Sequence, residues 1–145
     1  MAEEASEMAG RDVPKQGEFV WSEIAATDAD KAQAFYENVF GWNFKKSDAG
    51  GMDYREFSPG GDRPVGGLYQ IDPAWFGGNP PPAHWMIYVA VDDVDANAEL
   101  AKSLGAQVHK VMDIPNVGRM AIIQDPTGAM IATFKPNMGG VKSNG

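Results

Sequence analysis

The sequence predicts an α+β fold built from two βαβββ modules in tandem, and three observations support this prediction. A strand-like run followed by a helical run begins at residue 19, and the same order begins again at residue 84. Equivalent residues recur at a nearly constant interval, because Asp93 lies 65 residues after Asp28 and Gly105 lies 64 residues after Gly41. A proline- and glycine-rich stretch at 72–83 separates the two segments. An internal repeat of this kind indicates the architecture before any single element is assigned.

The first module is expected to start with a strand over 19–27 and a helix over 28–41. Thr27 or Asp28 can accept hydrogen bonds from the free N–H groups at the start of that helix. The apolar residues of the helix recur at the spacing i, i+3, i+4 and i+7, which is typical of one buried face. Gly41 is expected to end the helix in the left-handed conformation. Three short strands should follow, at 42–46, 52–57 and 66–71.

The second module repeats this plan, with a strand over 84–92 and a helix over 93–105 that Asp93 caps and Gly105 ends. Three strands are expected after the helix, at 107–114, 118–125 and 129–135. The run 125–128, Asp-Pro-Thr-Gly, predicts a type I turn between the last two strands, because proline suits its second position and glycine its fourth. The predicted organisation is a mobile tail at 1–17, modules at 18–71 and 84–135, a linker at 72–83 and a second tail at 136–145.

Composition excludes several classes of function. The 145 residues include 12 Lys and Arg, 20 Asp and Glu, 2 His and no Cys, for a net charge of −8. A nucleic-acid partner is not expected, because binding would need clustered cations. The absence of Cys excludes disulfides, Cys-ligated zinc and Cys nucleophiles. No apolar run approaches the ~20 residues that span a bilayer, and the N-terminus resembles no secretory signal, so we expect no membrane partner and a cytoplasmic location.

Two sets of motifs resemble a known family. The first is D-x-D-K-A-x-x-F-Y-x-x-V-F-G-W at 28–42, and the second is D-D-V-D-A, G-A-x-V and D-P-x-G-A in the second half. Both are similar to the vicinal-oxygen-chelate superfamily of glyoxalases, bleomycin-resistance proteins and extradiol dioxygenases. The resemblance covers 18–135 and implies that the modules form an incomplete barrel around a concave cleft for a small molecule. It also implies a homodimer, with the cleft within one chain or between two.

The resemblance further implies four recurrent positions for metal ligands. In this sequence they fall at Trp21, near Gly67, at Met86 and at Ala132. None of these residues offers the nitrogen or oxygen donor that a divalent ion requires. A small shift in register would bring Glu23 or His84 nearer, but one or two donors do not make a metal site. We therefore predict no metal and no cofactor, which disfavours metal-dependent glyoxalase or dioxygenase activity.

Glu23 is the candidate catalytic residue. It lies in an otherwise apolar strand and shares a face with Trp21, because side chains alternate along a strand. If that face lines the cleft, desolvation should raise the pKa of the Glu23 carboxyl and make it a general base or an anchor for a cation. The alternative is a carboxylate paired with an arginine or a backbone donor near a strand edge.

Aromatic residues and methionines supply the other candidates. Trp75 and Phe76 lie in the linker, which suggests a cleft rim, a dimer contact or a lid. His109 is expected to face solvent, and a single histidine such as His84 is more often structural than functional. Core packing is the alternative for every aromatic or methionine candidate, and it is favoured for Trp42 and Phe44. The predicted ligand-binding set is Trp21, Glu23, Tyr54, Trp75, Phe76, His84, Trp85, Met86, Met120, Met130 and Phe134.

Three functions remain open at this stage. The favoured one is a metal-free protein that binds a flat or cationic small molecule by stacking and cation–π attraction. The second is an enzyme of the same superfamily, of lyase, isomerase or dioxygenase type, with Glu23 as general base or with a metal site that these positions do not reveal. The third is a dimeric interaction module without ligand chemistry, joined through a strand edge or through Trp75 and Phe76.

Overall fold

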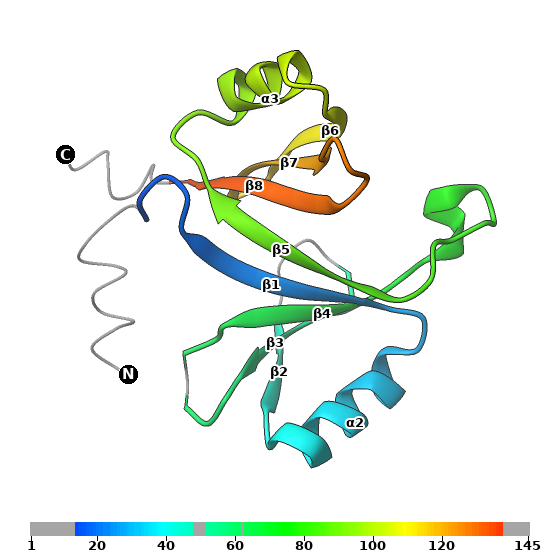
Figure 1. Cartoon of the computed structure of the whole chain (residues 1–145). Coiled ribbons are helices and arrows are strands. Elements are labelled where there is room, and N and C mark those ends of the chain that lie inside the picture. Colours follow the sequence, from blue (N-terminus) through cyan, green and yellow to red (C-terminus); the bar gives the residue numbers. More distant parts are fainter. Residues whose placement is uncertain (1–13, 48–51, 62, 138–145) are drawn as a thin grey trace. The chain divides into compact units, whose positions relative to one another are not determined.

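The computed structural model describes residues 14–47, 52–61 and 63–137, and within them the βαβββ order occurs twice. The predicted α+β class is confirmed, and every predicted element is present with bounds within two residues of the expected ones. In chain order the elements are β1 (Phe19–Ala26), α2 (Ala29–Phe40), β2 (Asn43–Ser47), β3 (Tyr54–Ser58), β4 (Gly66–Gln70), a 3-10 turn (Pro73–Phe76), β5 (His84–Ala90), α3 (Val94–Ser103), β6 (Gln107–Ile114), β7 (Gly118–Gln124) and β8 (Met130–Pro136) (Figure 1).

The described residues divide into two compact units. Unit 1 comprises Trp21–Met86, and unit 2 comprises the residues before Trp21 together with those from Ile87 onward. The predicted linker therefore belongs to unit 1, and part of it forms the 3-10 turn. The last residues of the predicted N-terminal tail are held in unit 2, because the N–H of Gly17 donates to the carbonyl of Ala90 at 2.8 Å. Most of both predicted tails lies outside the described residues.

In unit 1 the strands follow the order β2-β3-β4-β1, with β1 parallel to β4 and the other pairs antiparallel. Helix α2 covers one face of these strands (Figure 1). Alternate residues of each strand point toward the helix and away from it. The helix-side core consists of Ile24, Ala26, Ala29, Phe57 and Leu68. We call the opposite face of the strands, which carries Glu23 and Tyr69, the open face of unit 1.

An aromatic layer completes the helix side of unit 1. The ring of Trp42 stacks on that of Phe57, with 4.4 Å between centroids and 6° between planes. Trp85 at the start of β5 meets both rings edge-on at 6.2 Å. Such pairs add to the stabilisation that burial alone provides. The prediction that Trp42 and Phe44 belong to the core is confirmed, because both pack against the buried cluster.

Local signals set the ends of both helices as predicted. The Asp28 carboxylate accepts from the N–H of Lys31 at 3.1 Å, and the Asp93 carboxylate accepts from the N–H of Ala96 at 2.9 Å. Gly41 ends α2 at φ 70°, and Gly105 follows α3 at φ 97°. Side chains with a Cβ rarely adopt these positive φ angles, so glycine is favoured at both positions.

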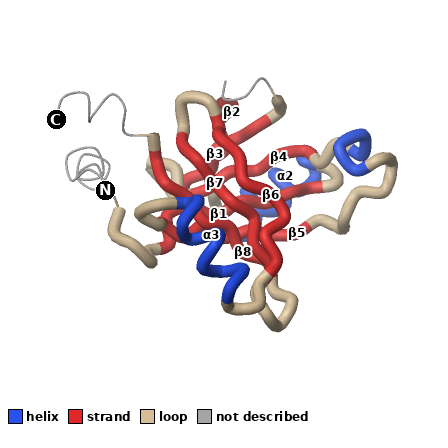
Figure 2. The backbone as a smooth tube through the Cα atoms, turned by 90° about the horizontal axis from the view of Figure 1, so that it is seen from above, coloured by secondary structure: helices blue, strands red, loops and turns tan. Residues whose placement is uncertain are grey.

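In unit 2 the strands follow the order β5-β8-β7-β6, and α3 lies across one face of them (Figure 2). The buried core on that side consists of Val91, Val94, Ala121 and Ile123. The predicted turn between β7 and β8 is confirmed, because the N–H of Gly128 donates to the carbonyl of Asp125 at 2.9 Å. No helix among the described residues is long and apolar enough to cross a membrane.

Candidate functional site

A chain of hydrogen bonds links three predicted site residues on the open face of unit 1. The indole Nε1 of Trp21 donates to the Tyr54 hydroxyl at 2.9 Å, and that hydroxyl donates to Oε2 of Glu23 at 2.8 Å. Trp21 and Glu23 share this face of β1, as strand alternation predicts. All three side chains are half-buried. The Glu23 carboxylate therefore accepts a hydrogen bond from a phenol, a donor that the sequence analysis did not foresee.

Gly67 makes this hydrogen-bonded chain possible. Strand β4 lies between β3 and β1, so the Tyr54 side chain must cross β4 to reach Glu23. In the strand register Gly67 lies directly opposite Glu23. A Cβ at position 67 would lie 2.9 Å from Cε2 of Tyr54 and nearer still to Cζ and the hydroxyl oxygen. Position 67 must lack a side chain for the Tyr54 ring to lie there.

Two phenols on this face stay protonated well above neutral pH. Burial, followed by the negative charge of Glu23, raises the pKa of Tyr54 far above its ordinary value. Burial also raises the pKa of Tyr69 to about 12, with the Glu23 charge as the second cause. Tyr69 is the cross-strand partner of Tyr54 and lies on the same face. Desolvation and a nearby negative charge both disfavour a phenolate, so each hydroxyl remains a hydrogen-bond donor.

The predicted aromatic pair of the linker lies close to these phenols. The ring centroid of Trp75 is 6.1 Å from that of Tyr69 and 6.4 Å from that of Phe76. The 3-10 turn that holds both residues starts at Asp72, whose carboxylate accepts from the N–H of Ala74 at 2.9 Å. Trp75 is 50% exposed and Phe76 is 45% exposed. Sequence reasoning missed Tyr69, although the two-residue period of β4 could have placed it on the face of Gly67.

Other candidates of unit 1 lie elsewhere. Trp85 belongs to the aromatic layer on the helix side, away from the open face that carries Glu23. The Nδ1 atom of His84 lies 2.8 Å from the carbonyl oxygen of Pro82, a contact that the Nδ1-protonated ring makes as donor. This contact favours the structural interpretation of His84. Met86 is half-buried on the same side of β5 as His84.

The candidates of unit 2 gather on the strand face opposite α3. Met120 and Phe134 are cross-strand partners, and Met120 is buried. Tyr88 meets the Phe134 ring edge-on at 6.3 Å. Met130 lies on the same side and is 45% exposed. His109 is exposed as expected, with its Nε2 atom 2.8 Å from Oε1 of Gln124.

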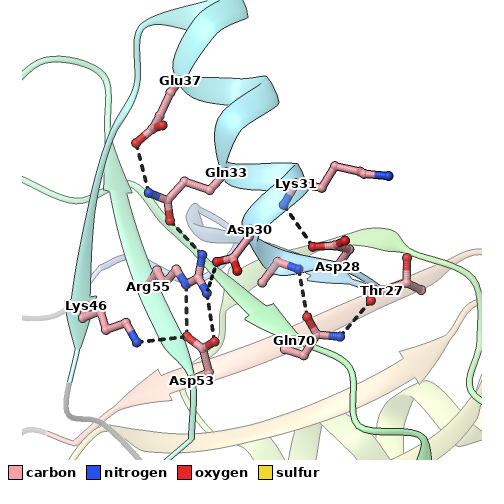
Figure 3. Close-up of polar contacts among 11 residues, drawn as sticks. Thr27, Asp28, Asp30, Lys31, Gln33, Glu37, Lys46, Asp53, Arg55 and Gln70 are labelled. Atoms are coloured by element: carbon pink, nitrogen blue, oxygen red, sulfur yellow. Dashed lines mark hydrogen bonds and ion pairs between the residues drawn. The ribbon is translucent and has the colours of Figure 1, made fainter.

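Sequence reasoning also missed a polar cluster on the helix side of unit 1, centred on Arg55 (Figure 3). This guanidinium is buried and makes two hydrogen bonds to Asp53, at 2.9 and 3.0 Å, and ion-pairs with Asp30 at 2.9 Å. Its Nη1 atom donates to Oε1 of Gln33 at 2.9 Å. The hydrogen bond from Arg55 is the main reason that the pKa of Asp53 lies below its ordinary value.

The Arg55 cluster joins β3 to the first turns of α2, which indicates a structural role. A shallow cavity of about 260 Å³ lies beside it, lined by Asp30, Gln33, Phe44, Lys45, Lys46 and Arg55. Asp53 directly precedes β3 and lies two residues before Arg55, and that two-residue spacing was the signal available in the sequence.

The residues present do not fit the metal ion that the resemblance implies. The four implied positions, Trp21, Gly67, Met86 and Ala132, offer no nitrogen or oxygen donor of the kind a divalent ion binds. The Tyr54 ring occupies the space into which a side chain at position 67 would project. In the part of the chain that the structure describes, no three His, Cys, Asp or Glu side chains gather as a metal site.

The tandem βαβββ units, with an open strand face that carries a carboxylate and aromatic side chains, define the class of protein. The family described as "Glyoxalase/Bleomycin resistance protein/Dioxygenase superfamily" matches residues 18–133. The chain belongs to this family, as the sequence motifs predicted.

Two relatives stand out by sequence. "Putative glyoxylase CFP32" of Mycobacterium tuberculosis (strain CDC 1551 / Oshkosh) is 40% identical over 126 residues, which are 86% of this chain and 46% of that protein. "Anthracycline biosynthesis protein DnrV" of Streptomyces peucetius is 32% identical over 125 residues, which are 79% of this chain and 46% of that protein. The chain thus spans about half the length of the curated relatives it matches.

Solved structures share the fold at lower identity. Methylmalonyl-CoA epimerase from Mycobacterium tuberculosis aligns with a TM-score of 0.56 and 17% identity, over 86% of this chain and 91% of that one. The Mn(II)-bound glyoxalase from Novosphingobium aromaticivorans aligns with a TM-score of 0.56 and 22% identity, over 84% of this chain and 41% of that one. At these identities the similarity concerns the fold alone.

Proposed function

We propose that this protein binds a flat, cationic small molecule, without a metal ion, on the open face of unit 1. The single observation that supports this most is the Glu23 carboxylate, which Tyr54 holds among aromatic side chains. Trp21 precedes Glu23 by two residues on β1, and Tyr69 of the neighbouring strand β4 is the cross-strand partner of Ala25, two residues after Glu23. A cation can pair with the carboxylate while its flat surface stacks on the exposed ring of Trp75.

The electrostatics of this face favour a cation over an anion. The carboxylates of Glu23 and Glu56 both raise the pKa of Tyr54, so both negative charges act at the same place. Lys45 is the cross-strand partner of Glu56 on the outer strand β2. Gly67 is the cross-strand partner of both Glu56 and Glu23. Two negative charges on the same face favour a cation over an anion.

The test uses two probes of the same shape and different charge. N-methylquinolinium is a planar cation, and quinoline is neutral at pH 8. Equilibrium dialysis should show tighter binding of the cation to the wild-type protein, and Glu23→Gln should remove that preference. His109→Ala, at an exposed residue of unit 2, is the matched control and should bind as the wild type does. Equal binding of both probes, or no binding of either, would overturn the proposal.

Dialysis against Mn²⁺ or Zn²⁺ tests the metal-free part of the proposal. We expect no stoichiometric retention of either ion, because the implied ligand positions lack suitable donors. A retained ion in a 1:1 ratio would contradict this part and would favour a metal site built from other residues.

An enzymatic function is the second candidate, and the Glu23–Tyr54 pair is the observation that favours it. A carboxylate can act as a general base and a neutral phenol beside it can donate a hydrogen bond to developing negative charge. Proton NMR in D2O, with small carbon acids such as thioesters and 2-oxo aldehydes, would detect exchange of an acidic C–H. Glu23→Gln should abolish that exchange and leave the circular dichroism spectrum unchanged.

We also propose that the chain forms a homodimer and acts in the cytoplasm. Sedimentation velocity measures the first point, and a monomer at micromolar concentration would contradict it. A dimer that binds neither probe would favour the third function, an interaction module without ligand chemistry.

A further inference from the structure

The side chain of Tyr54 crosses a whole strand before it reaches its partners. It starts on β3, passes over Gly67 of β4 and ends at Glu23 and Trp21 of β1. A phenol hydroxyl has one proton to donate and can also accept. Here the proton goes to Glu23, and the oxygen accepts from the Trp21 indole. Because an indole N–H only donates, the direction of both hydrogen bonds is determined.

We infer that Tyr54, whose ring packs closely over Gly67, is a positioning residue that orients the Glu23 carboxylate for a ligand with a cationic nitrogen. This inference rests on the proposed function and adds to it the residue pair that determines specificity. Tyr54 touches Glu23 and acts on the ligand through it. Gly67 acts through Tyr54, since its missing side chain leaves room for the Tyr54 ring.

The close packing of the Tyr54 ring over Gly67 also accounts for the poor fit of a metal ion. A metal-ligating side chain at position 67 would occupy the space of the Tyr54 ring, so the two arrangements exclude each other. With Tyr54 in place, the carboxylate of Glu23 accepts a hydrogen bond from an uncharged donor, so this contact does not cancel its negative charge. A diffuse organic cation suits such a carboxylate beside aromatic rings better than a small divalent ion, which needs several donors around it.

Two single variants should have the same effect on specificity through different atoms. Tyr54→Phe removes only the hydroxyl, and Gly67→Ala displaces the ring that carries it. We expect each to weaken binding of N-methylquinolinium by about tenfold, the scale of one lost charge-assisted hydrogen bond, and to leave binding of neutral quinoline nearly unchanged. Gly61→Ala is the matched control, because nothing lies within 4 Å of a Cβ at that position.

Two double variants separate positioning from folding. Tyr54→Ala removes the steric conflict with a side chain at position 67, so adding Gly67→Ala to the Tyr54→Ala protein should leave its urea midpoint unchanged and its selectivity for the cation low. Adding Tyr54→Phe to Glu23→Gln should cause little further loss of cation binding, because Tyr54 acts through Glu23.

The outcomes distinguish this inference from the proposed function. If the wild type prefers the cation and Tyr54→Phe keeps that preference in full, the positioning role is wrong and the proposed function stands. The same holds if Gly67→Ala, correctly folded, also keeps it. If the wild type binds neither probe, both the proposed function and the ligand class assigned to Tyr54 and Glu23 are overturned. Cation-selective loss in both single variants, with the double Ala variant as stable as Tyr54→Ala alone, supports the inference.

Discussion

At the scale of single residues, Tyr54 and Tyr69 on the open face of unit 1 stay protonated and uncharged well above neutral pH. Burial is the largest cause for both, and the Glu23 charge adds to it. A phenol whose pKa is raised by folding binds its proton more tightly in the folded state than in the unfolded state. Its contribution to stability is therefore complete below the unfolded pKa of about 10, and it is lost as the pH rises toward the folded pKa.

Alkaline unfolding measures this effect for Tyr69. Between pH 10 and the folded pKa of Tyr69, about 12, the free energy of unfolding of the wild type should fall. Tyr69→Phe should fall less steeply over the same range, because phenylalanine has no proton to lose. Urea unfolding at a series of pH values, with tyrosinate absorbance at 295 nm as the second readout, checks this. Identical pH profiles for the two proteins would contradict the raised pKa of Tyr69.

Arg55 provides a second prediction at this scale. Its buried guanidinium has three hydrogen-bonding partners, and lysine cannot reproduce that planar geometry. Arg55→Lys should lower the free energy of unfolding by roughly 1 to 3 kcal/mol, the cost of leaving buried partners unsatisfied. Arg119→Lys is the matched control: Arg119 also pairs with two carboxylates, but at a more exposed position, so the loss should stay within about 1 kcal/mol. Equal losses in urea unfolding would contradict a special role of burial at Arg55.

At the scale of elements, the residues that the sequence predicts as helix caps make the expected capping hydrogen bonds in the structure. Each helix starts at an aspartate that accepts from a backbone N–H three residues later, and a glycine with positive φ follows each helix. Such signals act within a few residues, so the sequence alone was sufficient to predict them. Most strand bounds were predicted for the same reason. The start of β3 was placed two residues early, because Met52 and Asp53 continue the alternating pattern without pairing to a neighbour.

The C-terminal end of α2 gives the prediction for this scale. Gly41→Ala should cost about 1 kcal/mol of folding stability, because an alanine at φ 70° brings its Cβ too close to the backbone. Gly61→Ala, at a position with open space and an ordinary φ, should be nearly neutral. Thermal and urea unfolding both measure the difference. A Gly41→Ala protein as stable as the wild type would contradict the left-handed conformation of that residue.

At the scale of the whole molecule, the net charge of −8 has the sign that would attract the cation expected at the proposed site. The family is recognised from motifs and spacing, and the family match over 18–133 confirms it. Net charge by itself only disfavoured nucleic acid as a partner. With Glu23 and Glu56 in the proposed site, we expect the net charge also to favour cations that approach from solution.

Salt dependence tests that charge effect. Binding of N-methylquinolinium should weaken as NaCl rises from about 0.05 M to about 0.5 M, because the screening length shortens across that range. Binding of quinoline, which is neutral, should change much less. Glu23→Gln should reduce the salt dependence for the cation. Equal salt dependence for both probes, measured by equilibrium dialysis, would contradict an electrostatic contribution to binding.

The sequence by itself determined the class of the fold, the repeat of the βαβββ module, the helix caps and the shared face of Trp21 and Glu23. All of these follow from interactions between residues close in the chain or from the two-residue period of a strand. Only the tertiary structure decided that Tyr54 reaches Glu23 across Gly67, that Tyr69 joins this face and that Trp85 and Arg55 lie on the helix side of unit 1. Those contacts depend on the order β2-β3-β4-β1, which pairs strands far apart in the sequence, and no local pattern specifies that order.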